Sequence, residues 1–388
     1  MTVVQPGGTL GILGGGQLGR MTAMAAAAMG YRVHVFDPDV DAPAAQVAAL
    51  HTAAPYDDLD AVKAFARSVD VVTFEFENVP VLTAEACEAA VPVRPSPQVL
   101  HVAQHRLREK QAMVGLGLPV TGFRAVNTLA ELQSALAALG VPAILKTAAS
   151  GYDGKGQQRI NAEADAAAAW DAIGRQPAVL EAFVPFQQEI SVIGARTASG
   201  EVALYAPFGN RHAHHILDVS VSPAALPYAV AQDACEIAYG ALNGLDVVGL
   251  LCVEMFVLEN GEVLVNEVAP RPHNSGHLTL DAHHTSQFEQ HVRAVCGLPL
   301  GPVEQHTPGA AMANLMGDLW AGGTPNWTAA LQSHPGVHLH LYGKSEPRPG
   351  RKMGHLTATA AGPDLAERLA REARTALTQT TSARSVVG

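Results

Sequence analysis

The sequence predicts an α/β fold with an additional α+β part, built from two or three packed domains. Strands alternate with helices through roughly the first 100 residues, which is typical of a parallel sheet. A small block of about 70 residues then places a glycine-rich loop between two strands, and strands dominate from Gln188 onward. The length of 388 residues agrees with this division, because domains average roughly 150 residues.

The composition argues against several classes of protein. Hydrophobic residues make up 48% of the chain and charged residues 16%, as in a folded globular protein. A net charge of −11 disfavours nucleic acid or an anionic membrane as partner, because a phosphate backbone requires clustered Lys and Arg. The longest apolar stretch, 247–258, contains Glu254 and is shorter than the ~20 residues of a membrane span. No basic segment precedes the apolar N-terminal residues, so we expect no signal peptide and a cytoplasmic protein.

The cysteines lie in apolar surroundings and form no C-x-x-C pair. We therefore expect buried free thiols rather than a disulfide or zinc framework. The four positions are Cys87, Cys235, Cys252 and Cys296.

The N-terminal segment has the pattern of a βαβ unit. A strand at 9–13 runs into a Gly-x-Gly-x-x-Gly turn at 14–19, a helix follows to Met29, and a second strand at 31–36 ends at Asp37. Such a turn can bind the pyrophosphate of a dinucleotide, so an NAD-dependent oxidoreductase is one interpretation. The alternative is that the glycines only allow a tight turn and close packing of helix on sheet. The N-terminal segment alone leaves both interpretations open.

The next segment completes this unit and leads to a domain boundary. A helix at 58–68 and a strand at 69–74 precede a polar turn, and three prolines between 92 and 97 close the unit. A single charged helix at 98–114 then leads into the glycine-rich segment 115–119, where we place the first boundary.

A second glycine-rich loop, 150–157, lies between two predicted strands. It is not a Walker A loop, because Lys155 is followed by Gly156 in place of Ser or Thr and a strand follows in place of a helix. Such a loop can fold over phosphates as a lid, with its N–H groups and Lys155 facing the charge and Lys146 adding a second cation. The alternative is a solvent-exposed hairpin with a chance lysine.

Two carboxylates, Glu254 and Glu267, interrupt the apolar strands of a hairpin that turns at Asn260-Gly261. An unpaired buried charge is costly, so a cation should compensate them. With Asn266 beside them, they are suitable hard-oxygen ligands for Mg²⁺, whereas the alternative is a pair of ordinary salt bridges. A phosphate lid together with a magnesium site indicates ATP.

Three further segments carry candidate side chains. Residues 269–277 combine Arg, His, Asn and Ser, which can recognise an anionic substrate and assist proton transfer. Basic residues cluster between 344 and 352, either to hold a substrate phosphate or as a solvated loop. Histidines at 211–215 suggest a transition-metal site, but no H-E-x-x-H motif or cysteine accompanies them. We therefore expect no zinc and interpret His212 as a nucleotide or substrate contact.

Together these motifs resemble the ATP-grasp enzymes, and among them the N5-carboxyaminoimidazole ribonucleotide synthetases. The likeness runs in the same order over nearly the whole chain, through residues 14–20, 74–78, 151–157, 266–277, 342–344 and 349–355. The formate-dependent glycinamide ribonucleotide transformylases are similar at 270–273, but Tyr152, Asp153 and the continuation 274–277 favour the carboxylating family.

The resemblance implies a three-part ATP-grasp fold with ATP between the last two parts. These parts are a Rossmann-like (pre-ATP-grasp) domain at 1–107 that binds no dinucleotide, a small lid domain at 108–184, and a C-terminal mixed α+β domain with the metal site at 185–388. The implied reaction is ATP- and bicarbonate-dependent carboxylation of 5-aminoimidazole ribonucleotide through carboxyphosphate, in purine biosynthesis. A formate-dependent glycinamide ribonucleotide transformylase and an NAD-dependent oxidoreductase are the alternatives.

The resemblance also implies the residues of the site. Those expected to bind ATP are Arg106, Lys146, Gly151, Tyr152, Asp153, Gly154, Lys155, Gly156, Gln157, Glu181, Ala182, Phe183, Val184, Glu189, His212, Asn266 and Glu267. The expected ligands of Mg²⁺, with two ions accompanying ATP, are Glu254 and Glu267. Those expected to bind substrate are Gln17, Leu18, Glu75, Asn78, Tyr152, Asp153, Arg271, His273, Asn274, Ser275, Lys344, Arg351 and Lys352. The catalytic candidates are Asp153, Lys155, Arg271 and His273. The family also suggests a homodimer, without NAD or zinc.

Overall fold

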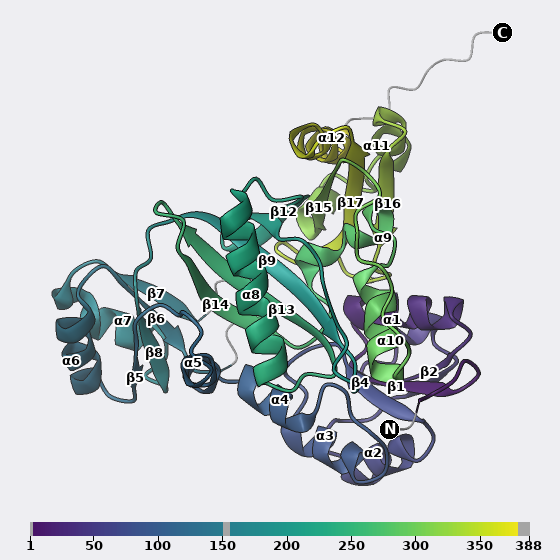
Figure 1. The fold of residues 1–388 in the computed structure, drawn as a ribbon, viewed down its shortest axis with the longest axis horizontal. Helices are drawn as coiled ribbons and strands as arrows, with labels where there is room; N and C mark the ends of the chain where they lie inside the picture. Colours follow the sequence, from purple (N-terminus) through teal and green to yellow (C-terminus); the bar gives the residue numbers. More distant parts are fainter. Residues whose placement is uncertain (1–2, 150–155, 379–388) are drawn as a thin grey trace.

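The computed structural model describes residues 3–149 and 156–378, and three β-sheets form its framework within these ranges (Figure 1). The first sheet is parallel, and the other two are built from antiparallel pairs. The predicted combination of α/β and α+β architecture is therefore confirmed.

The first sheet has the strand order β3-β2-β1-β4 and is covered on both faces. Leu10 and Ile12 on one face and Leu13 on the other face are fully buried, because helices pack on each side. Its strands are β1 (Thr9–Leu13), β2 (Arg32–Phe36), β3 (Leu50–Thr52) and β4 (Val71–Phe74). Its helices are α1 (Gln17–Ala28), α2 (Leu59–Ala66) and α3 (Val81–Glu88), with the short η1 (Ala45–Val47).

One face of this sheet is completed by a helix from far along the chain. Helix α10 (Gln287–Cys296) lies beside α1, and Val292 and Val295 pack into the same core as Leu10 and Val33 (Figure 1). The first sheet is thereby joined to the C-terminal part of the chain through apolar packing.

The single helix predicted at 98–114 is wrong, because the chain forms two helices there. Helix α4 (Pro97–Ala103) ends at Gln104, whose side-chain Nε2 donates to the carbonyls of Glu77 and Val79 at 2.7 and 2.6 Å. Helix α5 (Arg106–Gly115) then begins in a new direction, with the first N–H donating to the Ala148 carbonyl. The Arg106 N–H thus bonds to a distant segment in place of the Val102 carbonyl that a continuous helix would have given it.

The second sheet, with the order β5-β8-β6-β7, carries its own small core. Leu136, Leu145 and Trp170 lie in that core, so this block packs as a separate unit at the left of Figure 1. Its elements are β5 (Phe123–Val126), α6 (Leu129–Leu139), β6 (Ala143–Thr147), β7 (Gln157–Ile160), η2 (Glu163–Asp165), α7 (Ala166–Ala172) and β8 (Ala178–Ala182).

The third sheet runs β14-β13-β9-β11-β12-β15-β17-β16, with β10 beside β9. Its strands are β9 (Phe186–Arg196), β10 (Val202–Leu204), β11 (Phe208–Ala213), β12 (Ile216–Ser222), β13 (Gly249–Leu258), β14 (Val263–Ala269), β15 (Gly309–Met316), β16 (Val337–Leu341) and β17 (Lys352–Ala360). The accompanying helices are α8 (Tyr228–Gly244), η3 (Asn274–Gly276), α9 (Thr279–Ala282), η4 (Gly317–Trp320), α11 (Trp327–Ser333) and α12 (Pro363–Ala376). Alanines of α12 at 366, 370 and 373 are fully buried against the sheet, at the spacing of one helix face.

The predicted β13–β14 hairpin is confirmed. Its turn places Gly261 at φ +85, a value that favours glycine. The pairing sets Glu254 directly opposite Glu267, and a bulge follows between Glu254 and Met255. The two predicted metal ligands therefore lie at one place on adjacent strands.

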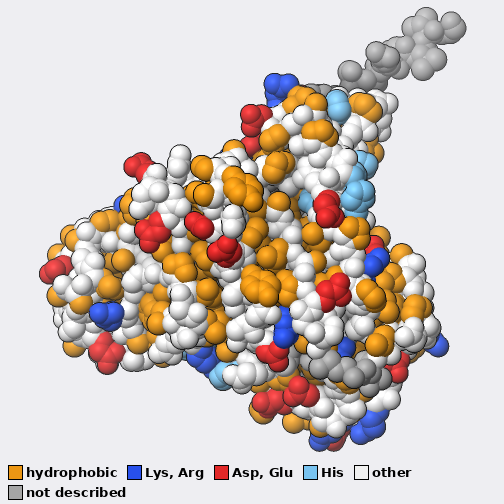
Figure 2. Space-filling view, in the orientation of Figure 1, with side chains coloured by type: hydrophobic (Ala, Val, Ile, Leu, Met, Phe, Trp, Pro, Cys, Tyr) orange, Lys and Arg blue, Asp and Glu red, His pale blue; other side chains and the backbone are white. Residues whose placement is uncertain are grey.

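Helix length, surface charge and the state of the cysteines can each be compared with what the composition predicts. No helix among the described residues is long and apolar enough to cross a membrane. On the face shown in Figure 2, basic side chains stand singly among acidic and apolar ones. All four cysteines are free thiols as expected, although Cys235 is only half-buried.

A buried hydrogen bond connects α10 to the first sheet. The His291 Nε2 atom and the Thr73 Oγ1 atom lie 2.8 Å apart, and neither side chain reaches solvent. Burial lowers the pKa of His291 from its usual 6.5 to about 3, because the imidazolium would lose its hydration. The depressed pKa contributes stability that is present above pH 6.5 and is lost as the pH falls toward 3.

Replacing this imidazole by a neutral amide tests the contribution. With His291→Gln, the unfolding free energy should fall less on acidification than that of the wild type, by about 2 kcal/mol at about pH 5. Urea unfolding of both proteins at about pH 7 and about pH 5 measures the difference. Equal losses in the two proteins would contradict a neutral, buried His291.

Candidate active site

A cleft of about 1370 Å³ lies where the three sheets approach one another. Its walls come from the carboxyl edge of the first sheet, from β6 to β8 of the second, and from β11, β13 and β14 of the third. Most of the predicted site residues line it. These are Gln17, Leu18, Glu75, Asn78, Arg106, Lys146, Gln157, Glu181, Ala182, Phe183, Val184, Glu189, His212, Glu254, Asn266, Glu267, Arg271, His273, Asn274 and Lys352.

Four predicted residues do not line the cleft. Ser275 is fully buried behind His273, and Gly156 lies beside Thr147 at the start of β7. Lys344 Nζ donates to the Lys352 carbonyl, and Arg351 donates to the Glu346 carbonyl. The predictions made for Gly151, Tyr152, Asp153, Gly154 and Lys155 concern positions outside the described residues.

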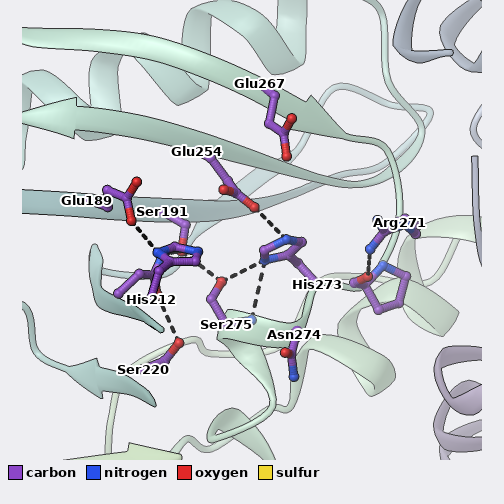
Figure 3. Close-up of polar contacts among 12 residues, drawn as sticks. Glu189, Ser191, His212, Ser220, Glu254, Glu267, Arg271, His273, Asn274 and Ser275 are labelled. Carbon is purple, nitrogen blue, oxygen red and sulfur yellow. Dashed lines mark hydrogen bonds and ion pairs between the residues drawn. The ribbon is translucent and has the colours of Figure 1, made fainter. Parts of the chain in front are cut away.

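The two hairpin carboxylates are each paired with a cation, and Figure 3 shows the pair of Glu254 with His273. Glu254 Oε1 lies 2.7 Å from His273 Nε2, and Glu267 Oε2 lies 2.9 Å from Arg106 Nη1. Burial opposes both charges of the first pair, but the pKa of Glu254 is lowered to about 2 by His273. The pKa of His273 is raised to about 10 by Cys252 and Glu254. At neutral pH this pair is therefore a carboxylate beside an imidazolium.

A second charged group lies deeper, at the junction of α5 and the second sheet. Glu181 Oε2 is 2.9 Å from Lys146 Nζ, and its Oε1 is 3.3 Å from Lys110 Nζ. Both lysines also approach Asn266, through its side-chain oxygen and its carbonyl. Burial raises the pKa of the Glu181 carboxyl, but the two lysines lower it by more, so the pKa lies below its usual value. This group couples the second sheet to β14 through hydrogen bonds from the charged lysines to the neutral Asn266.

Sequence reasoning missed Lys110 and Glu109, which both lie in this region. The Lys110 side chain is 2% exposed, and burial lowers its pKa despite Glu181. Glu109 lines the cleft, and burial, with Glu267 nearby, raises its pKa to about 8. Arg106, Glu109 and Lys110 share one face of a helix, and that spacing was the available signal. A charged helix face is usually solvated, so the pattern alone did not indicate burial.

A buried polar chain supports the candidate catalytic histidine (Figure 3). His273 Nδ1 lies 2.8 Å from Ser275 Oγ, which accepts from Ser191 Oγ at 2.7 Å. Asn210 Nδ2 donates to Ser191 Oγ at 3.0 Å and its Oδ1 accepts from Ser220 at 2.8 Å. These hydroxyl and amide groups hold the imidazole toward Glu254 from three strands of the large sheet.

His212 points to Glu189 rather than to other histidines (Figure 3). The His212 Nδ1 atom is paired with a Glu189 carboxylate oxygen, and the two residues belong to the adjacent strands β11 and β9. Within residues 3–149 and 156–378, no group of three or more His, Cys, Asp or Glu side chains is arranged to hold a metal ion. The structure pairs His212 with Glu189, and the role of His212 as a nucleotide or substrate contact stays a prediction.

The glycine-rich turn before α1 is occupied by carboxylates of the protein. The Gly16 and Gly19 N–H groups donate to the two oxygens of Glu75 at 2.8 and 2.9 Å, and Gly15 donates to Asp37 at 2.7 Å. A Cβ on Gly16 would lie 2.5 Å from Glu75, so glycine allows this close approach. The geometry supports the interpretation in which the glycines serve packing, since the donors that would face a pyrophosphate are already bonded.

The other wall of this region carries a cation. Arg271 Nη2 lies 2.6 Å from Glu77 Oε1, so the segment after β14 is paired with the segment after β4. Burial would lower the pKa of Arg271, but Glu77 raises it, so the guanidinium stays charged. The cleft therefore continues from the hairpin carboxylates to the carboxyl edge of the first sheet, a usual place for ligands in such sheets.

Three known domain families match successive parts of the chain. Residues 8–104 match the ribonucleotide synthetase preATP-grasp domain, and residues 111–288 match the ATP-grasp domain. Residues 310–369 match the phosphoribosylaminoimidazole carboxylase C-terminal domain. Fold and cleft thus define an ATP-grasp enzyme.

Individual relatives show which ATP-grasp enzymes this chain is similar to. The N5-carboxyaminoimidazole ribonucleotide synthase of Brucella melitensis is 46% identical over 358 residues, covering 92% of this chain and 97% of the relative. The chain spans 37% of the length of a bifunctional purine synthesis protein of Dictyostelium discoideum, to which it is 42% identical.

Solved structures with a similar fold belong to the same group of enzymes. An N5-carboxyaminoimidazole ribonucleotide synthetase in complex with ADP has a TM-score of 0.92 at 41% identity, covering 98% of this chain and 100% of that one. The Aspergillus clavatus synthase, in complex with ADP and 5-aminoimidazole ribonucleotide, has a TM-score of 0.87 at 32% identity, covering 95% and 98%. The chain belongs to the N5-carboxyaminoimidazole ribonucleotide synthase family, as its motifs predicted.

Removing the buried lysine tests the charged group around Glu181. We expect Lys110→Met to lower the free energy of unfolding by about 2–3 kcal/mol, because Glu181 keeps only one of its two close cations. Lys63→Met on the exposed face of α2 is the control, with an expected change within about 0.5 kcal/mol. Urea unfolding at about pH 7 compares them, and similar values for the two variants would contradict the assigned charge pairing.

Proposed function

We propose that this chain is an ATP-dependent carbon–nitrogen ligase that carboxylates 5-aminoimidazole ribonucleotide to N5-carboxyaminoimidazole ribonucleotide in purine biosynthesis. Bicarbonate is the proposed carbon source, and ADP and phosphate are the other products. One observation carries the proposal. A single cleft joins the cations and carboxylates of the ATP-grasp part to the Arg271 and His273 segment and to the carboxyl edge of the first sheet.

The part of the cleft between the second and third sheets suits ATP. Arg106 and Lys146 offer cationic groups for phosphates, and both face carboxylates of the same cleft. The segment after β8, including Phe183 and Val184, lines the cleft beside Glu189 and supplies apolar surface for a base. The predicted lid at 151–157 would add Lys155 and backbone N–H groups as further contacts to the phosphates.

The opposite part of the cleft suits the ribonucleotide. Arg271 and the imidazolium of His273 present positive charge beside Asn274. Lys352 of the C-terminal basic cluster also lines the cleft, which supports it as a contact for a substrate phosphate. The carboxyl edge with Gln17 and Asn78 would contact the remainder of the substrate.

The hairpin carboxylates fit Mg²⁺. Glu254 and Glu267 are opposite one another on adjacent strands, and both side chains are partly exposed to the cleft. Each meets its cationic neighbour through one oxygen, and two carboxylates with substrate phosphates are a usual ligand set for Mg²⁺. These two residues would hold the metal, which when bound neutralises charge on the transferring phosphate.

The proposed reaction has two stages. A bicarbonate oxygen bonds to the γ-phosphorus of ATP, the bond to the bridging oxygen of ADP breaks, and carboxyphosphate forms. Carboxyphosphate releases phosphate and CO₂, and the exocyclic amine of the ribonucleotide bonds to that carbon and loses a proton. Arg106 and Lys146 would hold phosphate oxygens, whereas Arg271 and His273 would hold the anionic reactants against one another. A closed lid would keep water from the short-lived intermediate.

Two finer statements belong to the same proposal, and the family resemblance supports the first of them. The enzyme is proposed to act as a homodimer and to reside in the cytoplasm. Neither NAD nor zinc is part of the proposed chemistry.

Substrate dependence tests the proposed reaction. ADP release measured by a coupled assay should be efficient only when 5-aminoimidazole ribonucleotide and bicarbonate are both present with Mg·ATP. Formate with glycinamide ribonucleotide should leave the rate at background. Efficient ADP release with the formate pair would move the assignment to the related transformylases, and NADH-dependent turnover without ATP would exclude the ligase.

The role of the hairpin carboxylates is tested by amide substitution. We expect Glu267→Gln to lower the rate of ADP formation by about 100-fold or more, because the amide is a weaker ligand for Mg²⁺. Glu262→Gln, at an exposed position of the same hairpin, should retain the wild-type rate. A near-normal rate in Glu267→Gln at saturating Mg²⁺ would remove the metal assignment.

A further inference from the structure

The backbone of His273 is held by one buried side chain. Gln287, the first residue of α10, has no solvent exposure and does not line the cleft. Its Oε1 accepts the His273 N–H at 2.8 Å, and its Nε2 donates to the His273 carbonyl at 2.7 Å. The same Nε2 lies 3.1 Å from His277 Nδ1. One amide thus bonds to both polar backbone groups of the candidate catalytic histidine, whose carbonyl also accepts the Gly276 N–H at 3.1 Å.

The side chain and the backbone of His273 are held by different residues. Glu254 and Ser275 fix the ring through its Nε2 and Nδ1 atoms. Gln287 instead fixes where the Cα of His273 stands. The fit is close, because a Cβ added to Gly276 would lie 2.9 Å from Gln287 Cδ. The loop therefore packs closely on this amide.

Helix α10 is itself anchored on the other half of the site. One turn beyond Gln287, His291 bonds to Thr73 on β4, and Thr73 is followed two residues later by Glu75. Val292 and Val295 add apolar packing against the first sheet. One helix therefore relates the position of His273 to the carboxyl edge of the first sheet, where the ribonucleotide is proposed to bind.

We propose that Gln287 is a positioning residue for the carboxylation reaction. It places His273 at the correct distance from both Glu254 and the first sheet, although it touches neither substrate nor metal. This inference rests on the proposed function, which supplies the reaction that His273 serves.

The same helix offers a closely matched control. Gln290 is also without solvent exposure, its Oε1 accepts the Gly301 N–H at 2.8 Å, and its Nε2 donates to the Gly301 carbonyl at 2.7 Å. Gly301 belongs to a loop that does not line the cleft. Gln287→Leu and Gln290→Leu therefore each remove two hydrogen bonds to the backbone of one residue, which is His273 in the first case and Gly301 in the second. Gln287→Leu also removes the contact with His277 Nδ1.

The experiment compares these two variants of the full chain by kinetics. With Gln287→Leu, kcat/KM for 5-aminoimidazole ribonucleotide should fall by about ten- to a hundred-fold, because misplacement near 1 Å can cost that much. The KM for ATP should stay within about two-fold of the wild-type value, since the nucleotide contacts are elsewhere. Gln290→Leu should keep both parameters near those of the wild type while losing similar stability toward urea. Equal kinetic losses in the two variants would overturn the proposal.

A conservative variant covers the case in which Gln287→Leu does not fold. Gln287→Asn keeps the amide on a side chain shorter by one methylene and adds no charge, so it should weaken both hydrogen bonds and show a smaller loss of kcat/KM than Gln287→Leu. Crystal structures of the Gln287 and Gln290 variants give a readout independent of activity. His273 should leave hydrogen-bonding distance of Glu254 only in the Gln287 variants, and an unmoved His273 would overturn the inference. A wild-type enzyme without activity would refute the proposed function but leave this structural comparison decisive.

Discussion

The arrangement of the cleft depends on pairing three strand carboxylates, Glu181, Glu254 and Glu267, with cations from other elements. Helix α5 does much of this, because Arg106 and Lys110 are one turn apart and reach different strands. Arg106 pairs with Glu267 on β14, and Lys110 pairs with Glu181 on β8. An unpaired carboxylate in such surroundings would destabilise the fold by several kcal/mol. The need for compensation therefore places α5 at the junction of the second and third sheets and holds the nucleotide half of the cleft in shape.

When substrates enter, the protein partners in these ion pairs can be replaced by phosphates and Mg²⁺. The groups that stabilise the fold are therefore also the groups that the proposed chemistry uses. Phosphates would take Arg106 and Lys146 as partners, and Mg²⁺ would take the hairpin carboxylates, so each charge keeps a partner of opposite sign. The charges are thus positioned before the nucleotide arrives, which lowers the reorganisation that catalysis requires. On the substrate side, Arg271 is held by Glu77 and His273 by Glu254 in the same manner.

Local signals predicted the parts of the site that neighbouring residues determine, and failed where distant contacts decide. The Asn-Gly turn and the two interrupted apolar strands were sufficient to predict that Glu254 and Glu267 lie on the paired strands of one hairpin. The glycine-rich turn stayed ambiguous because its N–H groups are bonded to Glu75, 56 residues beyond Gly19. Strand β15 was missed because both of its faces are buried, so it shows no alternation. Gln287 carried no signal, since a lone buried glutamine is recognised only by its partners.

The most direct test of this account is a crystal structure of the enzyme with Mg²⁺ and a non-hydrolysable ATP analogue. We expect the nucleotide to lie between the second sheet and the Glu254–Glu267 hairpin. Its phosphates should contact Arg106 and Lys146, with Glu75 still bonded to the glycine-rich turn. A nucleotide bound instead over the turn at 14–19, with Glu75 displaced and the hairpin carboxylates still paired only with protein cations, would contradict it.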